Sequence, residues 1–168
     1  MIDHSAKLRV SEIFHSLQGE STRAGLPTVF VRLTGCPLRC TWCDTEYAFS
    51  GGETRTLGDV LIAVARHGAG QVCVTGGEPL AQKACLPLLS VLCDAGYSVS
   101  LETSGALDIS SVDPRVSRIV DLKAPASGEA DKNLWDNLAH LNAHDEIKIV
   151  LADEADYAWA KSVLAARR

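Results

Sequence analysis

No stretch of the 168-residue sequence approaches the roughly 18 consecutive apolar residues that a transmembrane helix requires. The opening residues, MIDHSAKLRV, also lack the apolar core of a secretory signal peptide. We therefore expect a cytoplasmic protein with no membrane partner.

The sequence lacks an excess of basic residues. Lys and Arg total 16 against 21 Asp and Glu, which gives a net charge of −5. A broad nucleic-acid surface needs clustered positive charge, so nucleic acid is not an expected partner. The 16 cations leave room for a local basic pocket. No internal repeat or low-complexity tract is visible.

The six cysteines are not needed to staple a small fold. The chain is 46% hydrophobic and long enough for one domain with its own core. Disulfides are rare in a reducing cytoplasm, so metal binding or buried thiols are the better interpretations. Cys73, Cys85 and Cys93 stand inside apolar runs and are predicted to be buried thiols.

Short β-rich runs alternate with amphipathic segments. The predicted strands are residues 8–14, 29–33, 72–75, 98–102, 118–122 and 147–151. The predicted helices are 57–67, 80–95 with a bend at Pro87, 133–143, and 154–165 with Asp153 as N-cap, besides a weaker turn or helix at 109–116. This alternation predicts right-handed βαβ units, and hence an α/β fold with a parallel sheet.

Polar or glycine-rich runs follow four of these strands. A cysteine-rich loop follows 29–33, TGGEP occupies 75–79, ETSG occupies 102–105 and DLK occupies 121–123. Parallel sheets place ligands at the carboxyl ends of their strands, so the four runs are expected to share one rim. Glu102 and Ser104 belong to that rim.

Three cysteines in the first run have the spacing C-x3-C-x2-C, at Cys36, Cys40 and Cys43. Iron–sulfur clusters are held by cysteine thiolates, and three thiolates leave one iron of a cubane open for a substrate or cofactor. A structural zinc site is the alternative, because zinc normally takes four ligands and His15 or His67 would have to complete it.

The same spacing, with Trp42 before the last cysteine, is the signature of the radical S-adenosylmethionine superfamily. The run TGGEP resembles the superfamily motif that holds the methionine end of that cofactor. The resemblance implies a partial (βα) barrel, a 4Fe-4S cluster and S-adenosylmethionine, whose amino and carboxylate groups chelate the open iron.

Further runs narrow the resemblance to the 7-carboxy-7-deazaguanine synthase family. They are EIFHSLQGE at 12–20, the pattern G-x-P-x-x-F-x-R-x-x-G-C ending at Cys36, CDT at 43–45, LETSG at 101–105 and DLKAP at 121–125. The family converts 6-carboxy-5,6,7,8-tetrahydropterin to 7-carboxy-7-deazaguanine with loss of ammonia, for queuosine synthesis. The resemblance therefore implies a carbon–nitrogen lyase that uses Mg²⁺, a reducing electron donor such as flavodoxin, and a homodimer.

The resemblance also implies residue roles. The expected S-adenosylmethionine contacts are Trp42, Cys43, Asp44, Gly77, Glu78, Asp121, Leu122 and Lys123. The expected pterin contacts are Leu17, Gln18, Gly19, Arg32 and Thr75, and Thr45 is the expected Mg²⁺ ligand. These roles are chemically reasonable, because an amide reads donor and acceptor edges, a guanidinium grips a carboxylate and Mg²⁺ prefers oxygen.

Structural rather than functional interpretations stay open for several of these residues. Gln18 and Thr45 could be loop residues, Arg32 could form a structural ion pair with Glu20, and Lys123 could be solvated. Trp42 could be simple packing, and the glycines of TGGEP could form a plain tight turn.

Two features depart from the family pattern. Ser21 stands where the family often has Gly after L-Q-G-E. The chain also reaches Arg168 directly after its last predicted helix, so we expect a single domain over residues 1–168 that is C-terminally truncated, without the last strand and tail of the family. Two other functions remain: an activating enzyme for a glycyl-radical protein, and a zinc-binding interaction module.

Overall fold

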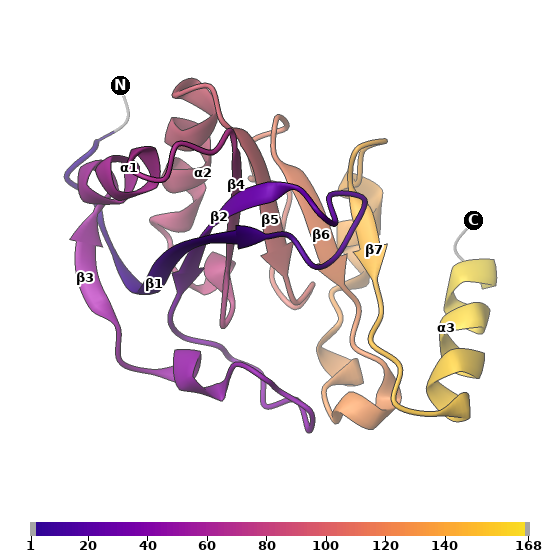
Figure 1. Cartoon of the computed structure of the whole chain (residues 1–168). Coiled ribbons are helices and arrows are strands. Elements are labelled where there is room, and N and C mark those ends of the chain that lie inside the picture. The colour runs from indigo at the N-terminus through magenta and orange to yellow at the C-terminus, as the bar shows by residue number, and fades with distance from the viewer. Residues whose placement is uncertain (1–2, 167–168) are drawn as a thin grey trace.

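The computed structural model describes residues 3–166 and is organised around one seven-stranded sheet, in the order β3-β1-β2-β4-β5-β6-β7 (Figure 1). The strands are β1 (Lys7–Leu17), β2 (Pro27–Leu33), β3 (Glu53–Thr56), β4 (Gln71–Gly76), β5 (Ser98–Thr103), β6 (Ser117–Asp121) and β7 (Glu146–Lys148). The sheet is open, since β3 and β7 lie at its two edges. This agrees with the predicted α/β fold and partial barrel.

The parallel part of the sheet runs from β2 through β4, β5 and β6 to β7. At the other end of the sheet β1 pairs antiparallel with both β2 and β3, so the sheet is mostly parallel rather than parallel throughout. The cause is the short 18–26 connection, because a parallel pair needs a crossover of a dozen or more residues. Strand β3 was not predicted, since ETRT has no apolar residue to mark it.

The two faces of the parallel strands have different chemistry. Along β2, Val29, Val31 and Leu33 join the main hydrophobic cluster, whereas Phe30 and Arg32 line a cavity on the opposite face. This follows from the period of two along a strand. Helices α1 (Leu57–Ala65) and α2 (Cys85–Asp94) cover the apolar face (Figure 1). The cavity face is left for function.

The helix predictions were confirmed in part. Helix α1 begins at a capping box formed by Thr56 and Asp59. Helix α2 begins at Cys85 rather than residue 80, and Pro87 lies in its first turn, where its missing N–H is not needed. Helix α3 (Glu154–Ala166) stands beyond β7, and Asp153 caps it by accepting the N–H of Asp156 at 2.8 Å (Figure 1).

The predicted helix over 133–143 is confirmed only in part, as a shorter 3-10 helix. The chain there forms short 3-10 turns, including η5 (Trp135–His140). The reason lies in Asn137, whose side chain bonds the backbone of Gly105, Leu107 and Ile109, at 3.1, 2.8 and 3.1 Å. Segment 109–116 consists of turns, and the last strand is shorter than predicted and ends at Lys148. No helix within residues 3–166 is long and apolar enough to cross a membrane.

Candidate functional site

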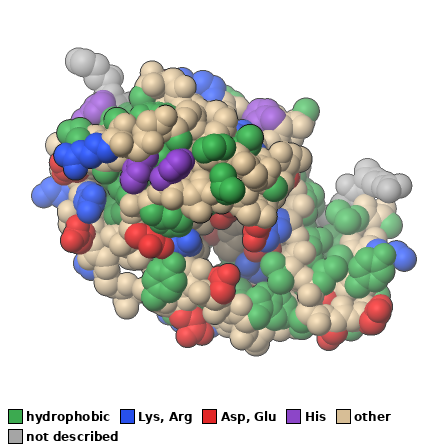
Figure 2. Space-filling model, viewed as in Figure 1, with side chains coloured by type: hydrophobic (Ala, Val, Ile, Leu, Met, Phe, Trp, Pro, Cys, Tyr) green, Lys and Arg blue, Asp and Glu red, His purple; other side chains and the backbone are tan. Residues whose placement is uncertain are grey.

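A cavity of about 780 Å³ lies at the carboxyl ends of the parallel strands, which is the expected rim. Its size suits a small organic ligand together with a cofactor. In Figure 2 the molecule is hollowed near its centre, with acidic and basic side chains around the opening. The predicted site residues that line the cavity are Leu17, Gln18, Gly19, Arg32, Cys36, Cys40, Trp42, Cys43, Asp44, Thr45, Thr75, Gly77, Asp121 and Lys123.

The cysteine loop follows β2 and is fixed by backbone hydrogen bonds. The N–H of Gly35 donates to the carbonyl of Ala48 at 2.8 Å, and that of Thr41 donates to Ser127 at 3.0 Å. Arg39 also donates to the carbonyl of Cys36 at 2.8 Å, and its Cζ lies 4.2 Å from the ring centroid of Phe49. The loop is thus shaped without any disulfide.

The three loop thiols are free, half-buried and on the cavity wall. Burial raises the pKa of Cys36 and Cys40 above the ordinary thiol value. Both are therefore protonated at neutral pH, and a metal must displace the protons to bind thiolates.

This donor set fits an iron–sulfur cluster, because each thiolate of a cubane binds a different iron. Within residues 3–166 no group of three or more His, Cys, Asp or Glu side chains is placed to hold a single metal ion. His15 and His67, the candidates for a fourth zinc ligand, are absent from the cavity wall and lie beside each other, with ring centroids 6.2 Å apart. They do not complete a site with the three cysteines.

The two glycines after β4 pack directly against the start of the cysteine loop. A Cβ on Gly77 would lie 2.3 Å from the carbonyl oxygen of Gly35, and one on Gly76 would lie 2.1 Å from that of Leu33. The N–H of Gly77 donates to Leu33 at 3.1 Å. The glycines are required by this close approach, which brings the TGGEP backbone to the edge of the cysteine loop.

The structure places Glu78 differently from expectation. Its side chain is fully buried and does not line the cavity. Its carboxylate accepts the N–H of Leu80 at 2.9 Å, the N–H of Ser104 at 2.7 Å and the hydroxyls of Thr103 and Ser104 at 3.0 and 2.5 Å. These bonds occupy the oxygens that were expected to meet the cofactor's ammonium. Glu78 instead ties the loop after β4 to the loop after β5.

Glu102 joins two predicted pterin contacts on the cavity floor. Gln18 is buried and donates from Nε2 to Glu102 Oε1 at 3.2 Å, and Thr75 donates from its hydroxyl to Oε2 at 2.8 Å. Burial raises the pKa of the neighbouring Cys73 thiol, and the charge of Glu102 raises it further. The floor therefore presents a carboxylate and an amide side by side, which suits a ligand edge that carries both donors and acceptors.

Arg32 has an ion-pair partner, but not the predicted one. Its Nε donates to Glu12 Oε1 at 2.7 Å, while Glu20 pairs with Lys148. Tyr47 donates from its hydroxyl to the same Glu12 oxygen at 2.9 Å. The guanidinium is 17% exposed and lies on the cavity wall.

Asp121 and Lys123 form an ion pair on the wall, with 2.9 Å between Oδ2 and Nζ. Lys123 is therefore not simply solvated. The other oxygen, Asp121 Oδ1, is buried and has no hydrogen-bond partner among the described residues. Leu122 is buried in the main hydrophobic cluster and does not line the cavity. The pair leaves one acceptor open to a ligand donor.

Lys148 is a cavity residue that the sequence argument missed. Burial alone would lower its pKa, but the hydrogen bond to Glu20 and the charges of Asp121 and Glu102 raise it above the ordinary value. It stays charged at neutral pH. An ionisable residue inside the strand EIK was the available signal.

Two stretches of the wall were not predicted. Phe14, Phe30 and Ile119 add apolar surface, and residues 150–152 follow β7. On the cysteine loop, the hydroxyl of Thr45 donates to Asp44 at 2.7 Å, so two oxygen ligands stand together. In total the cavity holds three thiols, several carboxylates and three cations, an arrangement able to take a cluster, an anionic ligand and a hard metal ion.

Comparison with known proteins gives a consistent result. The model of the radical SAM superfamily matches residues 30–124. The 7-carboxy-7-deazaguanine synthase of Chlorobaculum tepidum is 50% identical over 163 residues, covering 95% of this chain and 74% of that protein. The synthase of Koribacter versatilis is 46% identical and covers 92% and 69%. The crystal structure of QueE from Escherichia coli superposes with a TM-score of 0.81 at 29% identity, covering 95% of this chain and 78% of that one.

Proposed function

The chain belongs to the 7-carboxy-7-deazaguanine synthase family of the radical SAM superfamily, and from this premise we propose the reaction that it performs. It contracts the ring of 6-carboxy-5,6,7,8-tetrahydropterin to 7-carboxy-7-deazaguanine, releasing ammonia, in queuosine biosynthesis. The observation that carries the proposal is one cavity shared by the three loop cysteines, Arg32, Gln18 and Thr75.

Cys36, Cys40 and Cys43 would hold the 4Fe-4S cluster, which together with S-adenosylmethionine supplies one-electron cleavage of the sulfonium and a radical able to take hydrogen from the substrate. The close packing of Gly77 on Gly35 sets the distance between the cofactor loop and the cluster loop.

We assign the cofactor to Trp42, Cys43, Asp44, Gly77, Asp121 and Lys123, which line the cavity, and to the backbone of Leu122 between the last two. The free Oδ1 of Asp121 supports this assignment, because it is a buried acceptor suited to an ammonium or hydroxyl donor. Glu78 acts behind them, through Ser104 and Thr103.

The pterin would lie across the floor, with its carboxylate at Arg32 and its ring edge at Gln18, Thr75 and Leu17-Gly19. A guanidinium binds a carboxylate through two parallel hydrogen bonds. Thr45, with Asp44 beside it, supplies oxygen for a Mg²⁺ ion that keeps several of its waters.

Partners follow from the chemistry and the family. We include a one-electron donor such as flavodoxin, a second copy of the chain to form a homodimer, and a cytoplasmic location where S-adenosylmethionine is available.

The test is anaerobic reconstitution with iron and sulfide, followed by incubation with S-adenosylmethionine, reductant and 6-carboxytetrahydropterin. We expect a brown protein and 7-carboxy-7-deazaguanine by mass spectrometry. Cys40→Ser should lose iron, whereas Cys93→Ser, outside the loop, should keep it. A colourless zinc-loaded protein, or a brown protein that makes no deazaguanine, would refute the proposal.

A further inference from the structure

The environment of Arg32 is more specific than an ion pair requires. We propose that Glu12 and Tyr47 are positioning residues, which hold the guanidinium so that its two terminal nitrogens face the substrate carboxylate. The inference rests on the proposed function, since it concerns the same subsite.

Glu12 occupies only one edge of the guanidinium. The Nε–H donates to Glu12 at 2.7 Å, and within residues 3–166 the Arg32 side chain makes no other hydrogen bond. A guanidinium has five N–H donors, so the four on its terminal nitrogens stay available. The arginine side chain is 17% exposed and the glutamate 40%, which places the acid toward solvent and the arginine toward the cavity.

The hairpin fixes this pairing. Glu12 and Arg32 are directly opposite partners on β1 and β2, immediately after an irregularity in register between Val10 and Glu12. A one-residue slip would turn one of them to the other face. The antiparallel hairpin, which is unexpected in a parallel sheet, thus puts a carboxylate beside Arg32.

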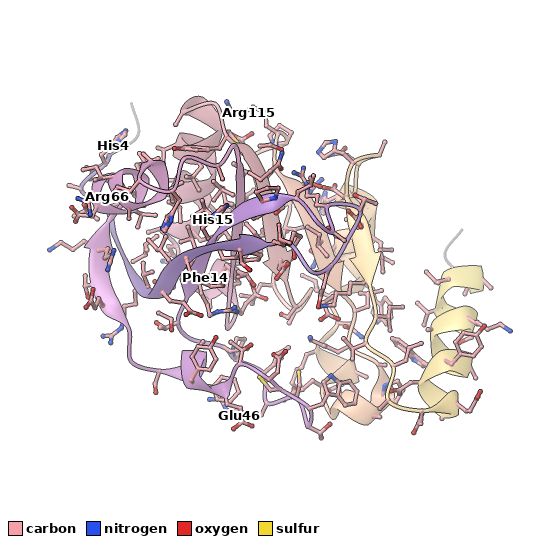
Figure 3. The ribbon with its side chains drawn as sticks, in the orientation of Figure 1. His4, Phe14, His15, Glu46, Arg66 and Arg115 are labelled. Atoms are coloured by element: carbon pink, nitrogen blue, oxygen red, sulfur yellow. The ribbon has the colours of Figure 1, made fainter. Side chains whose placement is uncertain are left out.

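Tyr47 connects this pair to the cysteine loop. It belongs to η1 (Glu46–Phe49), which directly follows Thr45, and its hydroxyl donates to Glu12 at 2.9 Å. The rings of Tyr47 and Phe14 each have their centroid 5.9 Å from Arg32 Cζ. Figure 3 labels Phe14 on β1 and Glu46, the neighbour of Tyr47 on η1. Aromatic faces beside a guanidinium restrict its rotation.

Losing Glu12 should have two opposite effects on anion binding at Arg32, and their balance distinguishes a positioning role from a purely electrostatic one. Removing its negative charge would by itself strengthen the binding of an anion at Arg32. Losing the hydrogen bond would free the guanidinium and weaken two-pronged binding. Positioning therefore predicts weaker binding against the electrostatic trend.

The experiment uses the reconstituted full chain and two stable probes, 6-carboxypterin and pterin without the carboxylate, measured by equilibrium dialysis. Glu12→Ala should bind 6-carboxypterin about tenfold more weakly and leave pterin unchanged. Glu12→Gln keeps the accepting oxygen and should stay within about threefold of wild type. Tyr47→Phe keeps the ring, and the residue is 59% exposed, so the variant should fold. Its affinity for 6-carboxypterin should lie between those of Glu12→Ala and Glu12→Gln. Glu46→Ala, on the same short helix but off the cavity wall, is the matched control.

In turnover, Glu12→Ala should raise KM for 6-carboxytetrahydropterin with little change in kcat, and substrate-free cleavage of S-adenosylmethionine should stay at the wild-type rate. Tighter binding of 6-carboxypterin by Glu12→Ala, or equal weakening for both probes, would overturn the positioning role. If wild type makes product and Glu12→Ala has the same KM and the same affinity for 6-carboxypterin, only this inference fails. If wild type makes none, the proposed function fails.

Discussion

Replacing Glu78 by glutamine tests whether this carboxylate builds the site or touches the cofactor. Glutamine keeps the shape but turns one oxygen into an NH₂ group. One oxygen accepts the N–H of Leu80 at 2.9 Å, and the other accepts the N–H of Ser104 at 2.7 Å. In either orientation a buried backbone N–H faces a donor.

The expected destabilisation follows from that count. A hydrogen bond to a charged acceptor contributes about 1.5–3 kcal/mol, and leaving a buried donor without an acceptor costs about 1–3 kcal/mol. The two figures partly describe the same loss, so they are not added. We therefore expect Glu78→Gln to lose about 3 kcal/mol of unfolding free energy. For a chain of this size that lowers Tm by about 6–12 °C.

The assay is thermal unfolding of the metal-free chain by circular dichroism, with S-adenosylmethionine binding measured separately after reconstitution. Glu46→Gln, an exposed carboxylate off the cavity, should melt like wild type. If Glu78→Gln also melts like wild type yet loses the cofactor, the carboxylate meets the cofactor directly and the reasoning here is wrong.

Three further predictions follow from other contacts. Gly77→Ala would push a Cβ against Gly35, so the loops should separate and iron content after reconstitution should drop severalfold; full iron loading with normal turnover would contradict this. Burial alone would raise the pKa of the Asp145 carboxyl, but hydrogen bonds from Arg118 and from backbone N–H groups lower it below the ordinary value. The ionised carboxylate therefore stabilises the fold above about pH 4, and this stabilisation is lost as the pH falls further. In an acid titration of unfolding free energy, Asp145→Asn should lack this pH-dependent loss. Ser21 has φ 66°, so Ser21→Gly should change unfolding free energy by less than about 1 kcal/mol, strain relief offsetting chain entropy, as denaturant titration would show.

The parallel strands and the rim could be predicted because their signals are local. Buried runs such as 72–75 read as strands, and each polar run follows one directly. The antiparallel hairpin at β1 and β2 could not be read in the same way, because pairing direction depends on connection length and on where the neighbouring strands lie. The 3-10 form of the helix within 133–143 could not be predicted either, because it depends on hydrogen bonds between Asn137 and backbone groups some thirty residues away.

The sequence could predict which residues belong to the site, but not which contacts their side chains make. Spacing and motif runs identified many of the residues that line the cavity, whereas the direction of each side chain did not follow from them. Glu78 faces inward because the donors at Ser104 and Leu80 lie behind the loop. Lys148 reaches the cavity from the last strand, whose short length weakened its signal.

The loop that carries Gln18 is completed by residues made much later. Thr22 donates to Glu146 through its N–H and its hydroxyl, at 3.1 and 2.7 Å, and Glu20 pairs with Lys148. The separation of 124 residues means that, at 5–20 residues per second, roughly 6–25 s of synthesis pass between the two sides of this contact. During that interval β3 and β4 are available to pair with the hairpin, but the loop between β1 and β2 still lacks its contacts to Glu146 and Lys148. The part of the cavity wall that carries Gln18 is therefore completed only after the cysteine loop has been synthesised.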